Sequence, residues 1–365
     1  MKTSPAAEAS SPVNLRKVGA HRGIRALAWH GDILYASRGY QIVRVNPRLT
    51  LPSNSVDNTP SPAWESVARF RPALWRNLAS RSTLTYRLAR EGFHALSILG
   101  GNGMIAAVPG AIVTRVPTST EFIVTHTIGR GTRPLHITTV PGGVTYWGEY
   151  FGNRERAEVH IYASADRGES WQIAYTFPAG SIRHIHNIVY DRWGDCLWIL
   201  TGDEGAECKI LRASCDLRVV DEVLSGNQQA RAAAAIPMPD ALYFSTDTPF
   251  ESNHILRLDR SGNVRPIAGL ASSSIYGCRV GEAMFFSTMV EPGAVNHSRE
   301  VHITGSKNGS DWRVLAHWQK DKLSMRYFQY GNAMLPDGDT TTNYLAATTI
   351  AVQQDDLVTT LWEVA

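Results

Sequence analysis

The segment Arg133–Glu207 reads RPLHITTVPGGVTYWGEYFGNRERAEVHIYASADRGESWQIAYTFPAGSIRHIHNIVYDRWGDCLWILTGDEGAE. Short runs rich in β-branched and aromatic residues alternate here with turns that contain Gly, Pro and Asp. The runs cover residues 144–147, 159–162, 171–175, 185–189 and 197–200. Strands that follow one another at intervals of about 8–12 residues, with turn residues between them, are typical of all-β sandwiches, barrels and propellers. We therefore expect two successive blades of a β-propeller in this segment.

One turn in the segment carries a more specific motif. Ser164-x-Asp166-x-Gly168-x-x-Trp171 resembles the Asp box, or BNR repeat, of sialidase-like propellers. In that turn the Asp carboxylate accepts backbone N–H groups, the Gly adopts a positive φ and the Trp packs beneath. In the superfamily the box lies on the face away from the active site, so the resemblance implies a structural role for Asp166.

The same alternation of strands and turns continues along most of the chain. Units are expected at about 23–70, 94–128, 133–178, 184–224, 231–270, 275–318 and 327–365. Seven units of roughly 45 residues match the period of propeller blades, with six or eight blades as the alternatives. The last run, 357–364, could pair with the N-terminal blade and close the ring. We predict an all-β, seven-bladed propeller forming a single domain over 19–365, after a disordered tail over 1–18 that is rich in Ser, Pro and Ala.

Residues 71–91 interrupt the β pattern between the first two blades. Leu74 and Leu78, and then Leu84 and Leu88, recur at i, i+4, which predicts a short helical insertion. Five arginines make the insertion basic. It could meet an anionic membrane surface or an acidic polymer. We favour a helix that caps the propeller and carries solvated arginines, because charged runs usually face water.

Composition limits the class of protein further. A formal net charge of +3 gives no reason to expect a nucleic-acid partner. The four cysteines show no C-x-x-C spacing, so we expect free buried thiols rather than a zinc finger or a disulfide framework. No run of about 18 apolar residues is present, so no transmembrane helix is predicted. The first residues lack the apolar core of a secretory signal, and we expect a cytoplasmic protein.

Further strings resemble one branch of the sialidase-like (BNR-repeat) superfamily, found among bacterial and archaeal proteins linked to surface polysaccharides. They are GEYF, RHIH, GD-x-x-x-E, Q-x-x-RA and TDTP, at residues 148–151, 183–186, 202–207, 228–232 and 246–249. The F/Y-R-I-P motif of true sialidases is missing from the start of the sequence, and TRVP at 114–117 differs from it in position and composition. The resemblance therefore implies an architecture rather than a reaction, and sialic acid is not the expected substrate. We predict a carbohydrate-active propeller with a polar site on its axis.

Propeller topology indicates where the ionisable residues should meet. Loops that enter the inner strands and loops that follow the second strands open on the same face, around the axis. The first set carries Arg133, His136, Arg183, His184, His186 and Arg231, and the second carries Glu149, Tyr150, Asp203, Glu204, Asp247 and Glu291. We expect both sets to converge in one polar funnel. Buried charges cost free energy unless they are paired, so the cluster is either a functional site or a structural ion-pair network.

Three chemistries would use such a funnel. In glycoside hydrolysis of a bacterial surface polysaccharide or exopolysaccharide, two carboxyl groups among Glu149, Asp203 and Asp247 act as acid and as base or nucleophile. The arginines at 133, 183 and 231 would then hold an acidic sugar. In β-elimination on a uronic-acid polymer, as in propeller polysaccharide lyases, His184 or His186 would move the proton and Tyr150 would be the partner acid. Hydrolysis is our first prediction because carboxylates are in excess.

The third chemistry is metal binding. The i, i+2 spacing of His184 and His186 puts both imidazoles on one side of a strand, where they could hold a divalent metal. Either histidine could instead donate a hydrogen bond to a neighbouring blade. No other cofactor is expected.

A propeller can also be a binding platform without turnover, for a glycan or for a protein. Trp147, Tyr150 and Phe151 would suit sugar stacking in an enzyme or in a binder. An enzyme should hold Glu149, His184 and Asp203 together in a closed cavity, whereas a binder should present a shallow aromatic face.

Overall fold

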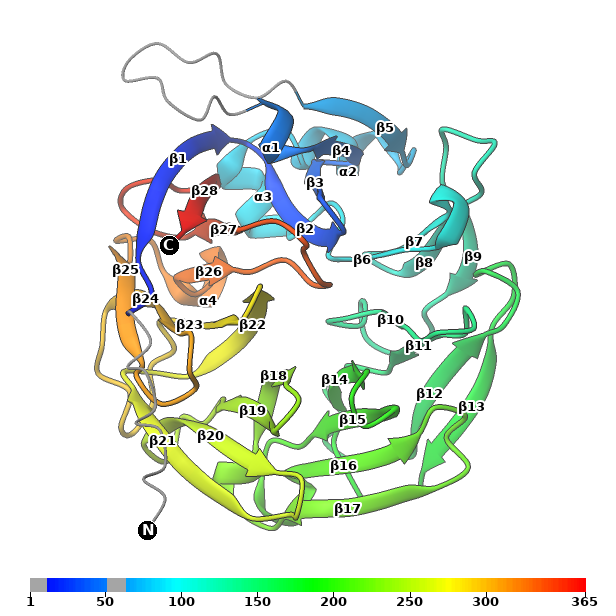
Figure 1. Cartoon of the computed structure of the whole chain (residues 1–365). Coiled ribbons are helices and arrows are strands. Elements are labelled where there is room, and N and C mark those ends of the chain that lie inside the picture. Colours follow the sequence, from blue (N-terminus) through cyan, green and yellow to red (C-terminus); the bar gives the residue numbers. More distant parts are fainter. Residues whose placement is uncertain (1–11, 51–63) are drawn as a thin grey trace, which may run out of the picture.

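The computed structural model describes residues 12–50 and 64–365. Within these residues seven four-stranded antiparallel sheets surround a central axis, which makes the fold a seven-bladed β-propeller (Figure 1). The predicted all-β class and the blade number are both confirmed.

In each blade the first strand lies next to the axis, and the following strands are added outward in chain order. The last blade differs only in its outer strand, which comes from the N-terminal part of the chain. The first three blades are β2 (Arg25–His30), β3 (Ile33–Arg38), β4 (Gln41–Val45) and β5 (Glu65–Arg69); β6 (Ala95–Ile98), β7 (Met104–Val108), β8 (Ala111–Arg115) and β9 (Ile123–Thr127); and β10 (Thr138–Thr139), β11 (Thr145–Gly148), β12 (Val159–Ser164) and β13 (Gln172–Phe177). The next two are β14 (Ile185–Asp191), β15 (Cys196–Thr201), β16 (Lys209–Ser214) and β17 (Val220–Ser225); and β18 (Ala232–Pro237), β19 (Ala241–Thr246), β20 (Asn253–Asp259) and β21 (Val264–Leu270). The last two are β22 (Ser274–Val280), β23 (Ala283–Thr288), β24 (Glu300–Ser306) and β25 (Arg313–Gln319); and β26 (Asn332–Met334), β27 (Tyr344–Ile350), β28 (Val358–Val364) and β1 (Leu15–Arg22).

The ring is closed by pairing of the two ends of the chain. β1 is the outer strand of the last blade and pairs antiparallel with β28, from Leu15 opposite Val364 to Arg22 opposite Val358. This confirms that the C-terminal run closes the ring. It also corrects the expected tail: the strand begins at Leu15, so residues 15–18 belong to a sheet, while residues 1–11 lie outside the described residues.

The predicted insertion between the first two blades is helical, and it forms two short helices, α2 (Leu74–Ala79) and α3 (Thr83–Ala89). The remaining helical turns are α1 (Pro47–Thr50), α4 (Met325–Phe328) and 3-10 turns at Gly100–Asn102, Gly205–Glu207 and Gln228–Ala230.

The insertion is anchored by an arginine rather than by its leucines. Arg87 is 2% exposed and lies 2.5 Å from Asp321 and 3.0 Å from Asp356. Leu74 and Leu78 remain 83% and 64% exposed. The expectation that the arginines of this segment are solvated is therefore wrong for Arg87, because its ion pairs reach across to the last two blades.

The turn between β12 and β13 has the contacts expected of an Asp box. The Asp166 carboxylate accepts hydrogen bonds from the Ser170 N–H, at 2.9 Å, and from the Ser164 hydroxyl, at 2.7 Å. Hydrogen bonds from Ser170 lower the pKa of Asp166 to about 2. Gly168 has φ +87°, and a Cβ there would lie 2.6 Å from Oγ1 of Thr114, so the turn requires glycine.

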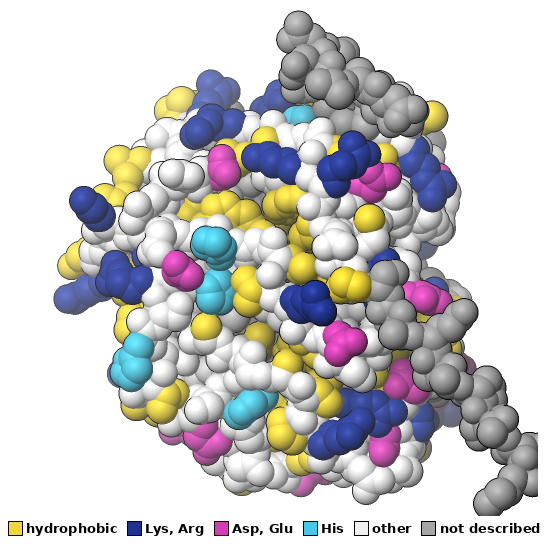
Figure 2. All heavy atoms as spheres, turned by 60° about the vertical axis from the view of Figure 1, so that its left-hand side comes forward, with side chains coloured by type: hydrophobic (Ala, Val, Ile, Leu, Met, Phe, Trp, Pro, Cys, Tyr) yellow, Lys and Arg dark blue, Asp and Glu magenta, His cyan; other side chains and the backbone are white. Residues whose placement is uncertain are grey.

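The core consists of side chains packed between neighbouring blades. Most second strands are buried along their whole length, as in β15, β19 and β23, because the sheets on both sides cover them. All four cysteines are free thiols; Cys196, Cys208 and Cys278 are buried and Cys215 is half-buried. Lys and Arg side chains lie among Asp and Glu side chains on the side drawn in Figure 2. None of the helices in the described part of the chain is long and apolar enough to cross a membrane.

Candidate functional site

A buried polar cluster takes its residues from four successive blades near the axis. The connection from each outer strand to the next inner strand lies on the same face as the loop between second and third strands, and we call this face the connector face. The cluster takes His184 and His186 from the start of β14, Asp203 from the β15–β16 loop and Arg231 from the connection before β18. The sequence predicted this convergence from topology alone.

Asp203 is the centre of the cluster. Its carboxylate oxygens lie 2.9 Å from Nη1 of Arg183 and 3.2 Å from Nη2 of Arg231. They also lie 3.5 Å and 3.4 Å from Nε2 of His184 and His186. Burial raises the pKa of Asp203, but contacts with the imidazoles, when these are protonated, outweigh burial and hold it well below its usual range. Asp203 is therefore an anion at neutral pH.

The two histidines face each other through their Nε2 atoms. Nδ1 of His184 lies 2.9 Å from the carbonyl oxygen of Phe151, and Nδ1 of His186 lies 2.9 Å from that of Ala232. Their Nε2 atoms lie 3.0 Å apart. The pairing of β14 with β15 shifts between Ile185 and Asn187, a β-bulge that leaves His186 outside the ladder. The predicted hydrogen bond to a neighbouring blade exists for both histidines.

Asp247 is the least compensated carboxyl group of the cluster. It is 6% exposed, its Oδ2 lies 3.6 Å from Nη2 of Arg231, and its Oδ1 has no hydrogen-bond partner among the described residues. Burial raises the pKa of Asp247 to about 8; Arg231 opposes this rise, and the charges of Glu291 and Asp203 add to it. Asp247 is therefore a carboxylic acid at neutral pH, beside a carboxylate.

Tyr150 and Glu291 complete the cluster. The Tyr150 ring lies 4.3 Å from the ring of His184, and burial raises the pKa of its hydroxyl to about 12. Glu291 is close enough for its charge to act on Tyr150, Arg231 and Asp247. Its Oε2 is buried without a partner in the described part of the chain. Tyr150, Arg183 and Glu291 are partly exposed, so the cluster reaches the surface of the connector face.

Glu149 and Trp147 do not join this cluster, contrary to the sequence-based expectation. The Glu149 carboxylate is held by Arg130, with Nε 3.0 Å from Oε1, and by the N–H of His160 at 2.8 Å. Trp147 is 2% exposed and stacks on Tyr162 with ring centroids 4.3 Å apart. Both side chains are therefore occupied inside the blade: Glu149 closes a loop and Trp147 fills the core.

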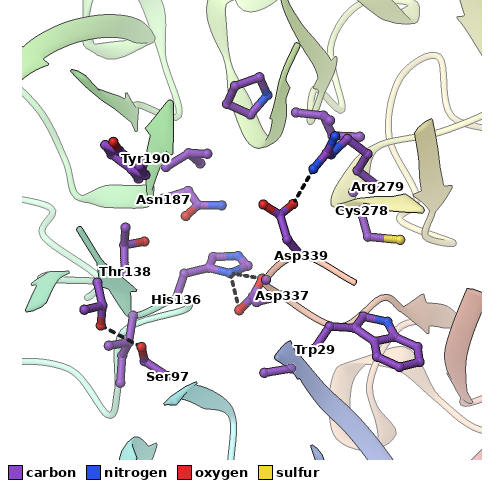
Figure 3. A pocket seen from close by; sticks show the side chains of 18 of the residues that line it. Trp29, Ser97, His136, Thr138, Asn187, Tyr190, Cys278, Arg279, Asp337 and Asp339 are labelled. Atoms are coloured by element: carbon purple, nitrogen blue, oxygen red, sulfur yellow. Dashed lines mark hydrogen bonds and ion pairs between the residues drawn. The ribbon is translucent and has the colours of Figure 1, made fainter. Parts of the chain in front are cut away.

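His136 belongs to a separate site near the other end of the axis. A cavity of about 500 Å³ opens there among the ends of the inner strands and the turns that follow them. His136 and Asp337 point toward each other across this cavity, with Nδ1 3.0 Å from Oδ1 (Figure 3). Arg279 pairs with Asp339 at 3.1 Å (Figure 3). The expectation of one funnel is wrong for His136, because its imidazole pairs with Asp337 in this cavity rather than with the cluster around Asp203.

Arg133 lies near a second arginine that the sequence analysis missed. Burial and then the charge of Arg25 lower the pKa of Arg133 to about 10. Arg25 donates to the carbonyl oxygen of Phe93 at 3.1 Å, and its Nε is buried without a partner. Neither arginine forms an ion pair with a carboxylate in the described residues. Arg25 opens β2, an inner strand, so the rule that selected Arg183 and Arg231 applies to it as well.

Three side chains could hold a metal ion. One ligand atom each from His184, His186 and Asp203 lies within 4.8 Å of the others, and the two histidines are buried.

Comparison with known proteins supports the fold and no finer class. No family model and no curated protein matches the sequence. Among solved structures, the WD40 β-propeller domain of Doa1 is 10% identical, with a TM-score of 0.57 over 96% of this chain and 97% of that chain. The extracellular domain of a putative hybrid two-component system, BT4673 from B. thetaiotaomicron, is 9% identical, with a TM-score of 0.54 over 96% of this chain and 42% of that one. A chain of the Mitotic Checkpoint Complex is 11% identical, with a TM-score of 0.53 over 100% and 99%. At these identities the likeness defines a β-propeller, and the function has to be argued from the site.

Proposed function

We propose that this propeller is a glycoside hydrolase that cleaves an acidic glycan in the cluster on the connector face. The observation that carries the proposal is that two carboxyl groups near Arg231 have buried oxygens without hydrogen-bond partners in the described residues. Asp247 and Glu291 each keep a buried oxygen without a hydrogen-bond partner among the described residues. Buried polar atoms are nearly always satisfied, so two such oxygens near Arg231 support a ligand that completes them.

Asp247 is the proposed general acid. A glycosidase needs a carboxyl group that stays protonated at working pH and donates its proton to the leaving oxygen. The pKa of about 8 that burial gives Asp247 meets this requirement.

Glu291 is the proposed partner, as base or nucleophile. Its charge acts on both Asp247 and Arg231, which supports this pairing. It is only partly buried, so a ligand or water can reach its carboxyl group. This replaces Glu149 in the pair expected from the sequence, because both oxygens of Glu149 are bound elsewhere.

The preference for an acidic sugar rests on the arginines. Arg25 is buried and Arg133 is half-buried, and no carboxylate among the described residues pairs with either. An arginine binds a sugar carboxylate through two parallel hydrogen bonds, which would offset that desolvation. The sialidase-like strings of the sequence, four of which carry Tyr150, Arg183, Asp203 and Arg231, support the same substrate class.

A second candidate function is β-elimination on a uronic-acid polymer. The contact that favours it is the Tyr150 ring 4.3 Å from His184, which puts a neutral phenol beside an imidazole. Burial lowers the pKa of His186, so a neutral base is also present. We place elimination second because both Nε2 atoms face Asp203 and each other rather than open space.

The test is incubation of the purified protein with a panel of acidic and neutral bacterial polysaccharides, read by reducing ends and by absorbance at about 235 nm, where the unsaturated product of elimination absorbs. Hydrolysis predicts new reducing ends without absorbance, lost in Asp247→Asn and Glu291→Gln and kept in the control Asp166→Asn, whose turn lies on the opposite face. Reducing ends with absorbance would replace hydrolysis by elimination. Full activity in both active-site variants would overturn the assignment.

A further inference from the structure

We propose that His184, His186 and Asp203 form a binding site for a divalent transition metal ion, with Zn²⁺ the ion that suits them best. Two imidazoles and one carboxylate are a ligand set that zinc takes in proteins. The inference does not rest on the proposed hydrolysis, since it uses neither Asp247 nor Glu291.

The first argument concerns the direction of the lone pairs. A backbone carbonyl can only accept, so each Nδ1 that bonds to one carries the proton. In a neutral imidazole the other nitrogen then has a bare lone pair. The Nε2 atoms of His184 and His186 therefore point into one small volume together with the Asp203 carboxylate, and a metal ion there would replace the proton that the 3.0 Å contact between the two nitrogens requires. Metal-bound histidines commonly bond to a carbonyl through the second nitrogen, which fixes their orientation.

The second argument concerns spacing. The two Nε2 atoms lie 3.0 Å apart, and each lies 3.4–3.5 Å from an oxygen of Asp203. Two ligands bound to one zinc ion at about 2.0–2.1 Å with tetrahedral angles stand roughly 3.3–3.4 Å apart. The three side chains are thus already at coordination spacing, and a small opening of the histidine pair admits the ion.

The third argument concerns charge. Asp203 is an anion at neutral pH and lies 2.9 Å from Arg183 and 3.2 Å from Arg231. A carboxylate offers about four acceptor positions, so Asp203 has lone pairs for both arginines and for a metal ion.

Three protein ligands leave a coordination position free. Catalytic zinc sites have three protein ligands and an open fourth position for water or substrate, whereas structural sites have four protein ligands. In this cluster that position would be taken by water or by a sugar oxygen.

The proposal is tested on the full chain after removal of metals with a chelator. Titration with Zn²⁺ alone, followed by calorimetry and by thermal melting, should show one ion bound per chain and a melting temperature that rises with free Zn²⁺. His186→Ala and Asp203→Asn should each weaken Zn²⁺ binding by more than about 100-fold. His302→Ala is the matched control, because His302 pairs with Glu300 on β24, outside the cluster, and binding should be unchanged.

A readout on the unaltered chain keeps the test valid if the variants fold poorly. Co²⁺ in place of Zn²⁺ should give the visible absorption of a four-coordinate site, displaced by one equivalent of Zn²⁺. Wild-type protein that binds neither ion and melts at the same temperature with and without Zn²⁺ would overturn the site. Equal binding by folded His186→Ala would also overturn it. None of these outcomes depends on hydrolysis, so failure here leaves the proposed function standing.

Discussion

Nη2 of Arg231 lies 3.6 Å from Oδ2 of Asp247, while Oδ1 of the same carboxyl group has no hydrogen-bond partner in the described residues. The arginine is thus close enough to bind the carboxyl group but does not satisfy it. Burial raises the pKa of Asp247 to about 8 although Arg231 opposes the rise, so the group carries a proton at neutral pH and its Oδ1 is available to a ligand.

The pH dependence of glycan cleavage should follow Asp247. Because the general acid must carry its proton, kcat/KM should fall as pH rises through about 8. The groups that set this value are Arg231, which lowers the pKa, and Glu291 and Asp203, which raise it. Replacing Glu291 by Gln removes one of the charges that raise the pKa of Asp247. Any residual activity of this variant should therefore begin to fall at a lower pH than the activity of the wild type. A pH–rate profile that stays flat from neutral pH to pH values above 8 would contradict this role.

Folding stability should respond to the same group in a defined direction. The folded-state pKa of Asp247 is raised above its ordinary value, so its contribution is fully present below pH 3.8 and is lost as pH rises toward about 8. Asn cannot ionise, so Asp247→Asn removes this loss of stability. At neutral pH the free energy of unfolding of the variant should therefore increase relative to that of the wild type. In acid the difference between the two should become smaller and reach a constant value. Urea unfolding at several pH values measures this, and a difference that does not vary with pH would count against a buried neutral acid.

Glu149→Gln should affect stability rather than chemistry. The change weakens the contact with Arg130 and the hydrogen bond from the His160 N–H, and should cost about 1–3 kcal/mol of unfolding free energy. The folded fraction should cleave glycans at the wild-type rate. Thermal melting and activity per folded molecule check the two parts. A stable but inactive variant would return Glu149 to the catalytic pair.

Arg87→Met tests the anchor of the helical insertion. It leaves Asp321 and Asp356 without their shared cation and frees the carbonyl oxygen of Phe328, to which Arg87 donates at 2.8 Å. Breaking a buried ion pair on one side costs about 3–5 kcal/mol, although the partial exposure of both aspartates reduces this. Arg81→Met is the control: its exposed side chain should change stability by no more than about 0.5 kcal/mol. Equal effects of the two changes would refute the anchor.

The blades were predictable because each strand and turn carries its own local signal. Turns separate the strands whatever the tertiary context. They contain glycines with positive φ, such as Gly168, and the Asp166 carboxylate that accepts backbone hydrogen bonds. Topology then placed Arg183, His184, His186, Arg231 and Asp203 on one face. Topology predicts only the face on which a residue lies, however. Which residue its side chain contacts depends on packing between blades.

That limit accounts for the residues that were misplaced. Glu149 follows its strand as expected, but Arg130 from the preceding connection binds it. Trp147 stands on a second strand that is covered on both sides, so a large aromatic there belongs to the core. Arg25 was not predicted because it lies in the first blade, whereas the strings that resemble sialidase-like propellers lie at residues 148–249.

The most direct test of hydrolysis in the Asp247 cluster is digestion of a responsive polysaccharide in water enriched in oxygen-18, with mass spectrometry of the products. Hydrolysis adds one water across each glycosidic bond at the anomeric carbon, so wild-type protein should place one oxygen-18 at each new reducing end, and Asp247→Asn should place almost none. Products that lack both the label and the mass of water would show cleavage by elimination. Undiminished labelling by Asp247→Asn would place the chemistry outside this cluster.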